Sequence, residues 1–115
     1  MIDMQWNVFW ANLDPVKGSE QAGKRPVLVI SAEEANTVLP VVTIMAITSL
    51  KPGRKVYPTE ILLPLTETNL SKDSIAMAHQ IRAISKSRLE EKTGEIKSDK
   101  IKSQIRDALR LYLDL

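Results

Sequence analysis

Short apolar stretches rich in β-branched and aromatic residues alternate with polar or proline-containing turns along the first two thirds of the chain. Runs of this length and composition predict strands rather than helices. A strand is expected at residues 7–13, 26–31, 39–48, 59–64 and 74–78. Residues 81–84 are expected to continue the last strand after a bulge or bend.

The C-terminal stretch has a different period. Ser98 and Asp99 form an N-cap signal, and the apolar residues that follow recur at helical spacing. They would share one face of an amphipathic helix, formed by Ile101, Ile105, Ala108, Leu109 and Tyr112. Shorter helical turns are expected at residues 32–36 and 85–89.

These elements indicate a mainly β (α+β) fold, a small barrel or sandwich with one helix packed against it. The sequence contains no internal repeat, low-complexity segment or Pro/Gly/Ser-rich linker, so residues 1–115 are expected to form a single domain.

The amino-acid composition excludes some kinds of functional site and favours others. The chain has 115 residues, no cysteine, 16 basic and 14 acidic side chains and a pI near 9.0. The lack of cysteine excludes disulfides and thiolate metal sites. Without a long apolar span or a leader-like start, we expect a soluble, cytoplasmic protein. Residues 15–57 hold six basic and three acidic side chains, which would suit a polyanion if their loops converge. The alternative is that these lysines and arginines simply solvate loops.

The connection over residues 14–24 is unusually long for a hairpin and carries two glycines. Its Gly18 to Lys24 spacing resembles a phosphate-binding P-loop, but Arg25 follows the lysine instead of the serine or threonine that the motif needs. The sequence therefore argues against nucleoside triphosphate binding.

Several segments, taken together and in this order, resemble the MazF/PemK family of toxin endoribonucleases. They are LDPVKGSEQAGKRPVLVIS at residues 13–31, AITS at 46–49, PTEILL at 58–63 and QIRAISKSRL at 80–89. The resemblance runs from about residue 7 to residue 113. It is specific because an ordinary loop would not need Gly, Glu-Gln, Gly and Arg-Pro together at these offsets.

The resemblance implies an SH3-like barrel of about five to seven strands with a C-terminal amphipathic helix, assembled as a homodimer. It further implies sequence-selective, metal-independent cleavage of single-stranded RNA without a cofactor. The protein would be the toxin of a toxin–antitoxin pair, held inactive by an antitoxin whose disordered, acidic tail covers the RNA groove.

The resemblance also suggests site residues. Arg25 and Thr48 correspond to the family's catalytic arginine and threonine. The residues expected to bind substrate are Lys17, Ser19, Glu20, Gln21, Lys24, Ser49, His79, Gln80 and Arg82.

The expected chemistry is attack of the substrate's own 2′-hydroxyl group on the adjacent phosphorus, which gives a 2′,3′-cyclic phosphate (or 3′-phosphate) and a 5′-hydroxyl end. A planar guanidinium suits a doubly charged phosphorane, so Arg25 is assigned to charge stabilisation. An arginine side chain keeps its proton at neutral pH, which makes it a poor general base. Thr48 would orient the reacting groups. Glu20 and His79 both remain candidates for the base.

Two other functions stay open. The same barrel occurs in toxins that bind DNA gyrase without nuclease activity, and an inactive homologue could bind RNA without cutting it. Trp6-Asn7 replaces the Gly-Asp often found in the family, and His79 replaces an acidic residue. Phe9 and Trp10 are interpreted as core or interface residues rather than as base-stacking ones.

Overall fold

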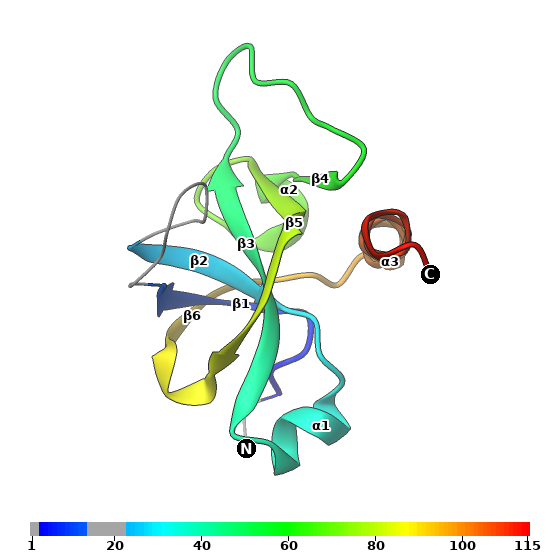
Figure 1. Ribbon diagram of the computed structural model, residues 1–115. Helices are drawn as coiled ribbons and strands as arrows, with labels where there is room; N and C mark the ends of the chain where they lie inside the picture. Colours follow the sequence, from blue (N-terminus) through cyan, green and yellow to red (C-terminus); the bar gives the residue numbers. More distant parts are fainter. Residues whose placement is uncertain (1–2, 14–22) are drawn as a thin grey trace.

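The computed structural model describes residues 3–13 and 23–115. Six antiparallel strands form one sheet in the order β4-β5-β3-β2-β1-β6, drawn in Figure 1. The elements are β1 (Asn7–Asn12), β2 (Lys24–Val29), α1 (Glu33–Val38), β3 (Val41–Ser49), β4 (Glu60–Leu63), α2 (Leu65–Thr68), β5 (Ser74–Ser85), the 3-10 helix η1 (Lys86–Arg88), β6 (Leu89–Glu95) and α3 (Asp99–Leu113). The mainly β fold with a C-terminal helix is therefore confirmed.

The sheet buries apolar side chains on both of its faces. Neighbouring residues of a strand point to opposite faces, and Val8 and Phe9 accordingly belong to two separate core clusters. Helix α3 covers the first cluster with Ile101, Ile105 and Ala108, which are buried as the periodicity predicted. The side chain of Ser98 accepts a hydrogen bond from the backbone N–H of Ile101, which caps the helix.

The long strand β5 bends where it crosses from one part of the sheet to the other. Its pairing with β3 is continuous except between Met45 and Ala46, where the register jumps from Ile81 to Met77. The expected bulge between the two halves of β5 is confirmed. His79 and Gln80 lie within this irregularity.

Strand β6 and helix α2 were not expected from the sequence. Strand β6 reads LEEKTGE and pairs only with β1, at the edge of the sheet. Most of its side chains are exposed or half-buried, so it lacks the apolar alternation that marks a strand with one buried face. Helix α2 has only four residues, too few for a helical period.

Trp6 stands at an unusual backbone position just before β1. Its φ of +68° lies in the left-handed region that favours glycine. The charged groups of Lys102 and Arg106 of α3 lie over its indole ring, 5.5 and 5.2 Å from the ring centre. Trp6 therefore contributes to the contact between α3 and the sheet. Within the described residues, no helix is long and apolar enough to cross a membrane.

Candidate functional site

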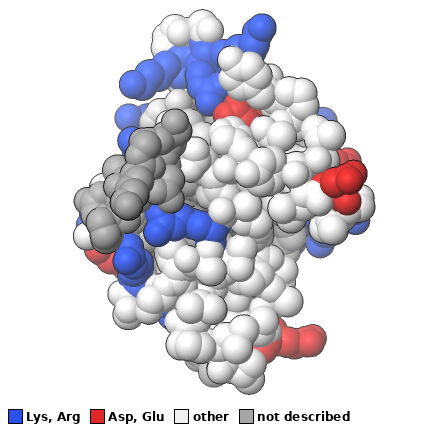
Figure 2. All heavy atoms as spheres, viewed as in Figure 1, with Lys and Arg blue, Asp and Glu red and all other residues white. Residues whose placement is uncertain are grey.

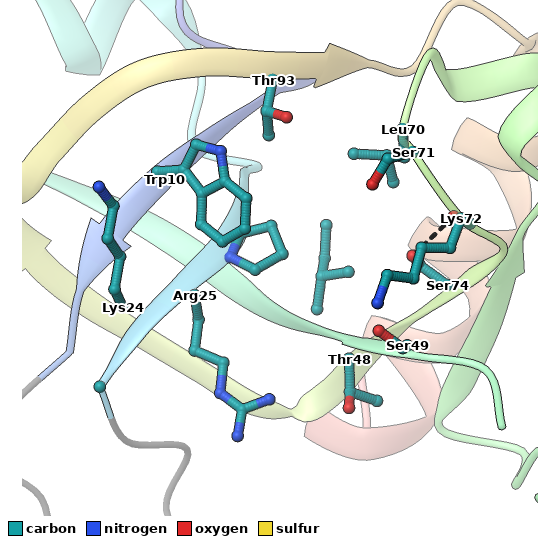
Figure 3. A pocket seen from close by; sticks show the side chains of 13 residues that line it. Trp10, Lys24, Arg25, Thr48, Ser49, Leu70, Ser71, Lys72, Ser74 and Thr93 are labelled. Atoms are coloured by element: carbon teal, nitrogen blue, oxygen red, sulfur yellow. Dashed lines mark hydrogen bonds between the residues drawn. The ribbon is translucent and has the colours of Figure 1, made fainter.

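A pocket of about 380 Å³ opens at the end of the sheet where β2 begins and β3 ends. Strands β1 and β6 and the connection from α2 to β5 supply the remaining walls (Figure 3). The residues lining it are Trp10, Gly23, Lys24, Arg25, Pro26, Ile47, Thr48, Ser49, Leu70, Ser71, Lys72, Ser74 and Thr93. Four of the residues suggested by the sequence lie among them: Lys24, Arg25, Thr48 and Ser49.

Strand pairing fixes the backbone positions of the two candidate catalytic residues. Arg25 is the second residue of β2 and lies opposite Ala11 of β1. Thr48 is the last but one residue of β3 and lies opposite Ile75 of β5. Figure 3 shows the guanidinium group and the threonine hydroxyl group on the same rim of the pocket. Both side chains extend from paired strands, which fix the positions of their backbone atoms.

Lys24 is held at the pocket by acidic residues of β6. Its ammonium group lies 2.7 Å from a carboxylate oxygen of Glu90 and 3.8 Å from one of Glu91. The hydrogen bond to Glu90 raises the pKa of Lys24, against a smaller opposing effect of burial. An anionic ligand that binds Lys24 would therefore compete with Glu90 for its ammonium group.

The charge of the pocket favours an anionic ligand. Its described lining contains three cations, Lys24, Arg25 and Lys72, and no carboxylate. Figure 3 shows Lys72 extending across the pocket toward the hydroxyl groups of Thr48 and Ser49. Cations and hydroxyl donors converging on one hollow can bind and polarise a phosphate group. Among residues 3–13 and 23–115, no three His, Cys, Asp or Glu side chains are grouped to hold a metal ion.

Trp10 lines the pocket and lies in neither core cluster, so the sequence-based expectation of a core position is wrong for this residue, while an interface position stays a prediction. Phe9 is buried, with 6% of its surface exposed, in the second core cluster. Trp10 is half-buried, lines the pocket and lies in neither cluster.

Three residues suggested by the sequence do not line this pocket. His79, Gln80 and Arg82 all lie on β5. The guanidinium of Arg82 donates to the backbone oxygen of Leu13 at 3.5 Å, just before the connection between β1 and β2. Lys17, Ser19, Glu20 and Gln21 lie outside the described residues.

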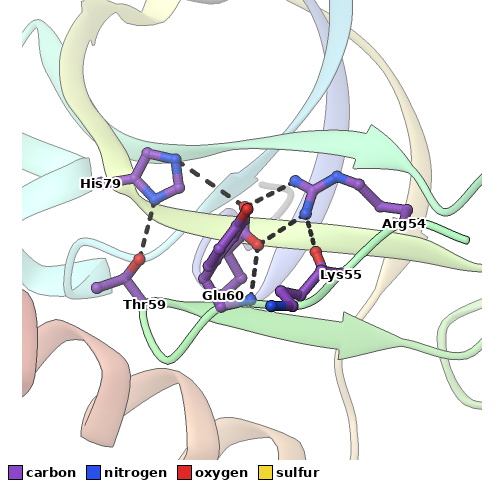
Figure 4. Close-up of polar contacts among 6 residues, drawn as sticks. Arg54, Lys55, Thr59, Glu60 and His79 are labelled. Carbon is purple, nitrogen blue, oxygen red and sulfur yellow. Dashed lines mark hydrogen bonds and ion pairs between the residues drawn. The ribbon is translucent and has the colours of Figure 1, made fainter.

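His79 belongs to a second polar cluster, shown in Figure 4. Its Nδ1 lies 3.1 Å from the hydroxyl of Thr59, and its Nε2 lies 4.0 Å from a carboxylate oxygen of Glu60. Arg54 donates to both oxygens of Glu60, at 3.0 and 2.8 Å, and the backbone N–H of Tyr57 donates at 2.9 Å. Burial disfavours ionisation of Glu60, yet these hydrogen bonds outweigh it and lower its pKa.

The Arg54–Glu60 ion pair connects a basic loop to strand β4. This loop joins β3 to β4 and also carries Lys51 and Lys55, and Figure 2 shows a group of basic side chains over it. The side chain of Glu60 is 1% exposed and that of Arg54 is 29% exposed. The buried carboxylate of Glu60 therefore holds the loop against β4 through its contacts with Arg54.

We expect Arg54→Ala to destabilise the protein, because it leaves the buried Glu60 carboxylate without its main partner. The expected fall in Tm is about 10 °C. Since the folded pKa of Glu60 is lowered, the pair stabilises the protein above the unfolded pKa of about 4.3, and this contribution disappears as pH falls through the folded value. The Tm difference between variant and wild type should therefore shrink in acid. Lys51→Ala, in the same loop, is the control, and an equal effect of the two substitutions would contradict the anchoring role.

The chain is similar to known toxins over nearly its whole length. A family model described as "PemK-like, MazF-like toxin of type II toxin-antitoxin system" matches residues 4–113. "Endoribonuclease MazF" of Staphylococcus saprophyticus is 38% identical over 109 residues, which cover 95% of this chain and 89% of that protein.

Solved structures agree with the described fold. The crystal structure of MazF from Deinococcus radiodurans has a TM-score of 0.81 at 28% identity and covers 100% of this chain and 99% of that one. A MazE-MazF crystal structure from the same organism has a TM-score of 0.72 at 28% identity, covering 96% and 94%. An SH3-like barrel is consistent with these similarities.

Proposed function

Because this chain belongs to the PemK-like, MazF-like toxins of type II toxin–antitoxin systems, we propose that its Arg25–Thr48 pocket cleaves single-stranded RNA through the substrate's own 2′-hydroxyl group. The chain is an endoribonuclease toxin, as the name of its 38% identical relative indicates. The similarity to an endoribonuclease favours nuclease activity over the two alternatives, gyrase binding and RNA binding without cleavage. The proposed target is messenger RNA, cut at a short preferred sequence.

One observation carries the proposal. Three cations and the hydroxyl groups of Thr48 and Ser49 line the same small pocket, which is the arrangement that a phosphoryl group gaining negative charge requires. Those positive charges come from the protein itself. The proposal therefore needs no metal ion and no cofactor for charge stabilisation.

The proposed reaction begins when the 2′-oxygen attacks the neighbouring phosphorus and loses its proton to a base. A phosphorane with two negative charges forms and then collapses as the bond to the 5′-oxygen breaks. The products are a 2′,3′-cyclic phosphate, which can open to a 3′-phosphate, and a 5′-hydroxyl end. The guanidinium of Arg25 would bind the non-bridging oxygens through two parallel N–H groups, most strongly when their charge is greatest.

Thr48 and Ser49 have positioning roles in the proposal. Their hydroxyl groups can donate to a phosphate oxygen while β3 holds their backbone in place. His79 contacts Thr59 and approaches Glu60 and does not line the pocket. Of the two bases considered from the sequence, His79 is therefore the less favoured, and Glu20, which lies outside the described residues, is the proposed base.

The remaining substrate-binding residues would follow the RNA beyond the pocket. His79, Gln80 and Arg82 share β5, and the guanidinium of Arg82 reaches the end of β1 at Leu13. Lys17, Ser19 and Gln21 belong to the same connection as Glu20. Lys24 would contact a phosphate at the pocket edge. These residues are proposed to set the position of the strand and the preferred sequence.

Cleavage in the presence of EDTA tests the proposal. The purified protein is incubated with a long single-stranded RNA, and the cut sites and end groups are mapped. Discrete cuts that leave cyclic or 3′-phosphates and 5′-hydroxyls are expected. Cleavage that appears only after a divalent metal is added, or that leaves 5′-phosphates, would contradict the mechanism.

Substitution of Glu90 should strengthen RNA binding. Glu90→Gln releases Lys24 from its carboxylate partner at 2.7 Å, and the expected gain in affinity is about two- to fivefold, within the range of an exposed ion pair. Glu91→Gln is the matched control, because that carboxylate lies 3.8 Å from Lys24, and it should have a smaller effect. Affinities are compared by fluorescence polarisation at low salt with an uncleavable oligonucleotide. Equal affinities of the wild type and Glu90→Gln would show that Lys24 does not meet the RNA.

We also propose two protein partners. The first is a second copy of this chain, because exposed apolar side chains such as that of Leu111, 60% exposed near the end of α3, are often found where protein surfaces associate. The second partner is an antitoxin whose acidic tail would compete with RNA for the cations of the pocket. Sedimentation of the purified chain tests the dimer, and a monomer at micromolar concentration would contradict it.

A further inference from the structure

The residues that line the pocket are of two chemical kinds. Lys24, Arg25, Lys72 and the hydroxyl groups described above are charged or polar, whereas Trp10, Pro26 and Leu70 are apolar. Cations alone would be enough to hold a phosphate. An aromatic and apolar surface beside them provides for a flat, weakly hydrated group as well.

Trp10 can offer its ring to a ligand. It stands opposite Pro26 in the pairing of β1 with β2 and is half-buried at the pocket. The ring of the other tryptophan, Trp6, already has the charged groups of Lys102 and Arg106 over it. Within the described part of the chain, no basic side chain is stacked on Trp10 in the same way.

Lys72 lines the same pocket as Trp10 but comes from another element. It lies between α2 and β5, next to Ser71, and Figure 3 shows its ammonium group inside the pocket. Lys72 forms no ion pair with any residue that the structure describes. Lys24, by contrast, is shared with Glu90. Lys72 is thus the lysine of the pocket whose charge the described acidic residues leave uncompensated.

An aromatic platform beside a cation is the arrangement that binds unpaired nucleotides, since each base has a face to stack and each nucleotide has a phosphate. We propose that Trp10 and Lys72 form a subsite for one nucleotide next to the scissile phosphate: Trp10 stacks the base and Lys72 contacts a phosphate. This inference rests on the proposed function and names two residues that bind the substrate. The volume of about 380 Å³ lies at the lower end of the range for small-molecule sites, roughly 300–1,000 Å³, and suits one nucleotide rather than several.

Fluorescence of Trp10 tests the stacking directly. Trp6→Phe leaves Trp10 as the only tryptophan, and the probe is a 2′-O-methyl RNA oligonucleotide of the mapped cleavage sequence, which binds without reacting. Saturable quenching of Trp10 is expected, because a stacked base is in direct contact with the indole. Trp10→Phe, which keeps Trp6, should show little change with the same probe. No quenching in the Trp6→Phe protein, while fluorescence polarisation reports binding, would overturn the proposal.

Steady-state cleavage gives a second test. Trp10→Leu should raise KM by about 5- to 150-fold, which corresponds to the 1–3 kcal/mol of one base–aromatic stack, and by more than it lowers kcat. Trp10→Phe retains a ring and should recover most of the loss. A KM for Trp10→Leu equal to that of Trp10→Phe would count against stacking.

Salt dependence tests Lys72. Removing one phosphate contact to a single strand should make the slope of log affinity against log salt shallower by about 0.7. This change is expected for Lys72→Met and not for Lys97→Met, at a lysine outside the pocket lining. Equal slopes for the two variants would remove Lys72 from the subsite.

The outcomes of these three tests are separable from failure of the proposed function. RNA cut in EDTA with no response from Trp10 or Lys72 would reject only the subsite, whereas quenching without any cleavage would reject only the reaction.

Discussion

Arg25→Ala should reduce RNA cleavage about 100- to 1,000-fold, the loss seen when a preorganised donor to a developing oxyanion is removed. The guanidinium lies on the pocket rim beside Thr48, and no other arginine lines the described part of the pocket. Because the stabilised charge grows as the phosphorane forms, the loss should appear mainly in kcat. The measurement is single-turnover cleavage of a short RNA that contains the mapped site.

Two controls make the Arg25 result interpretable. Arg25→Lys keeps the charge but lacks the planar pair of N–H donors, so its activity should fall between those of wild type and Arg25→Ala. Arg110→Ala removes an exposed arginine of α3 that pairs with Asp107 and should cleave like wild type. If folded Arg25→Ala cuts within threefold of Arg110→Ala, Arg25 is not part of the reaction.

Gly94→Ala should destabilise the protein and displace one wall of the pocket. A Cβ atom at Gly94 of β6 would lie 2.8 Å from the backbone oxygen of Thr68 and 2.7 Å from Cδ2 of Leu70. The leucine side chain can move, but the carbonyl belongs to the end of α2 and can only shift with its backbone. Overpacking of this kind costs about 1–3 kcal/mol.

The same substitution should also affect function, because the segment after Thr68 carries the pocket residues Leu70, Ser71 and Lys72. We expect a higher KM for RNA along with the lower urea midpoint. Lys92→Ala, at an exposed side chain of the same strand, should change neither. A wild-type urea midpoint and KM for Gly94→Ala would show that the close approach of β6 to Thr68 does not constrain this wall.

Local patterns were enough to predict most of the fold. The β-branched runs became β1 to β5, and the expected helical turns became α1 and η1. Helix α3 begins at its expected cap, although Tyr112 on the predicted apolar face is 46% exposed. Strand β6 was not predicted, because its polar residues face solvent at the edge of the sheet and give no apolar alternation. Its pairing with β1 is a tertiary contact that no local pattern contains.

The candidate site was predictable only in part, and for a different reason. The segment around Arg25 and the one around Thr48 are recognisable as family motifs. Trp10, Lys72 and Thr93 come from three separate elements that only the folded barrel brings together, so no spacing along the chain joins them. Alternation along β1 does not single out Trp10, because core clusters lie on both faces of the sheet. Lys72 resembles any other exposed lysine of a turn.

The central claim, that the pocket of Arg25 and Thr48 promotes attack by the substrate's own 2′-hydroxyl without a metal, is tested most directly with one altered substrate. A short RNA containing the mapped site is made with a single 2′-deoxynucleotide on the 5′ side of the scissile phosphate and incubated with the protein in EDTA. We predict that the unmodified RNA is cut to a 2′,3′-cyclic phosphate, while the substituted RNA binds with similar affinity and stays intact. Cleavage of the substituted RNA at the same phosphate would contradict the mechanism.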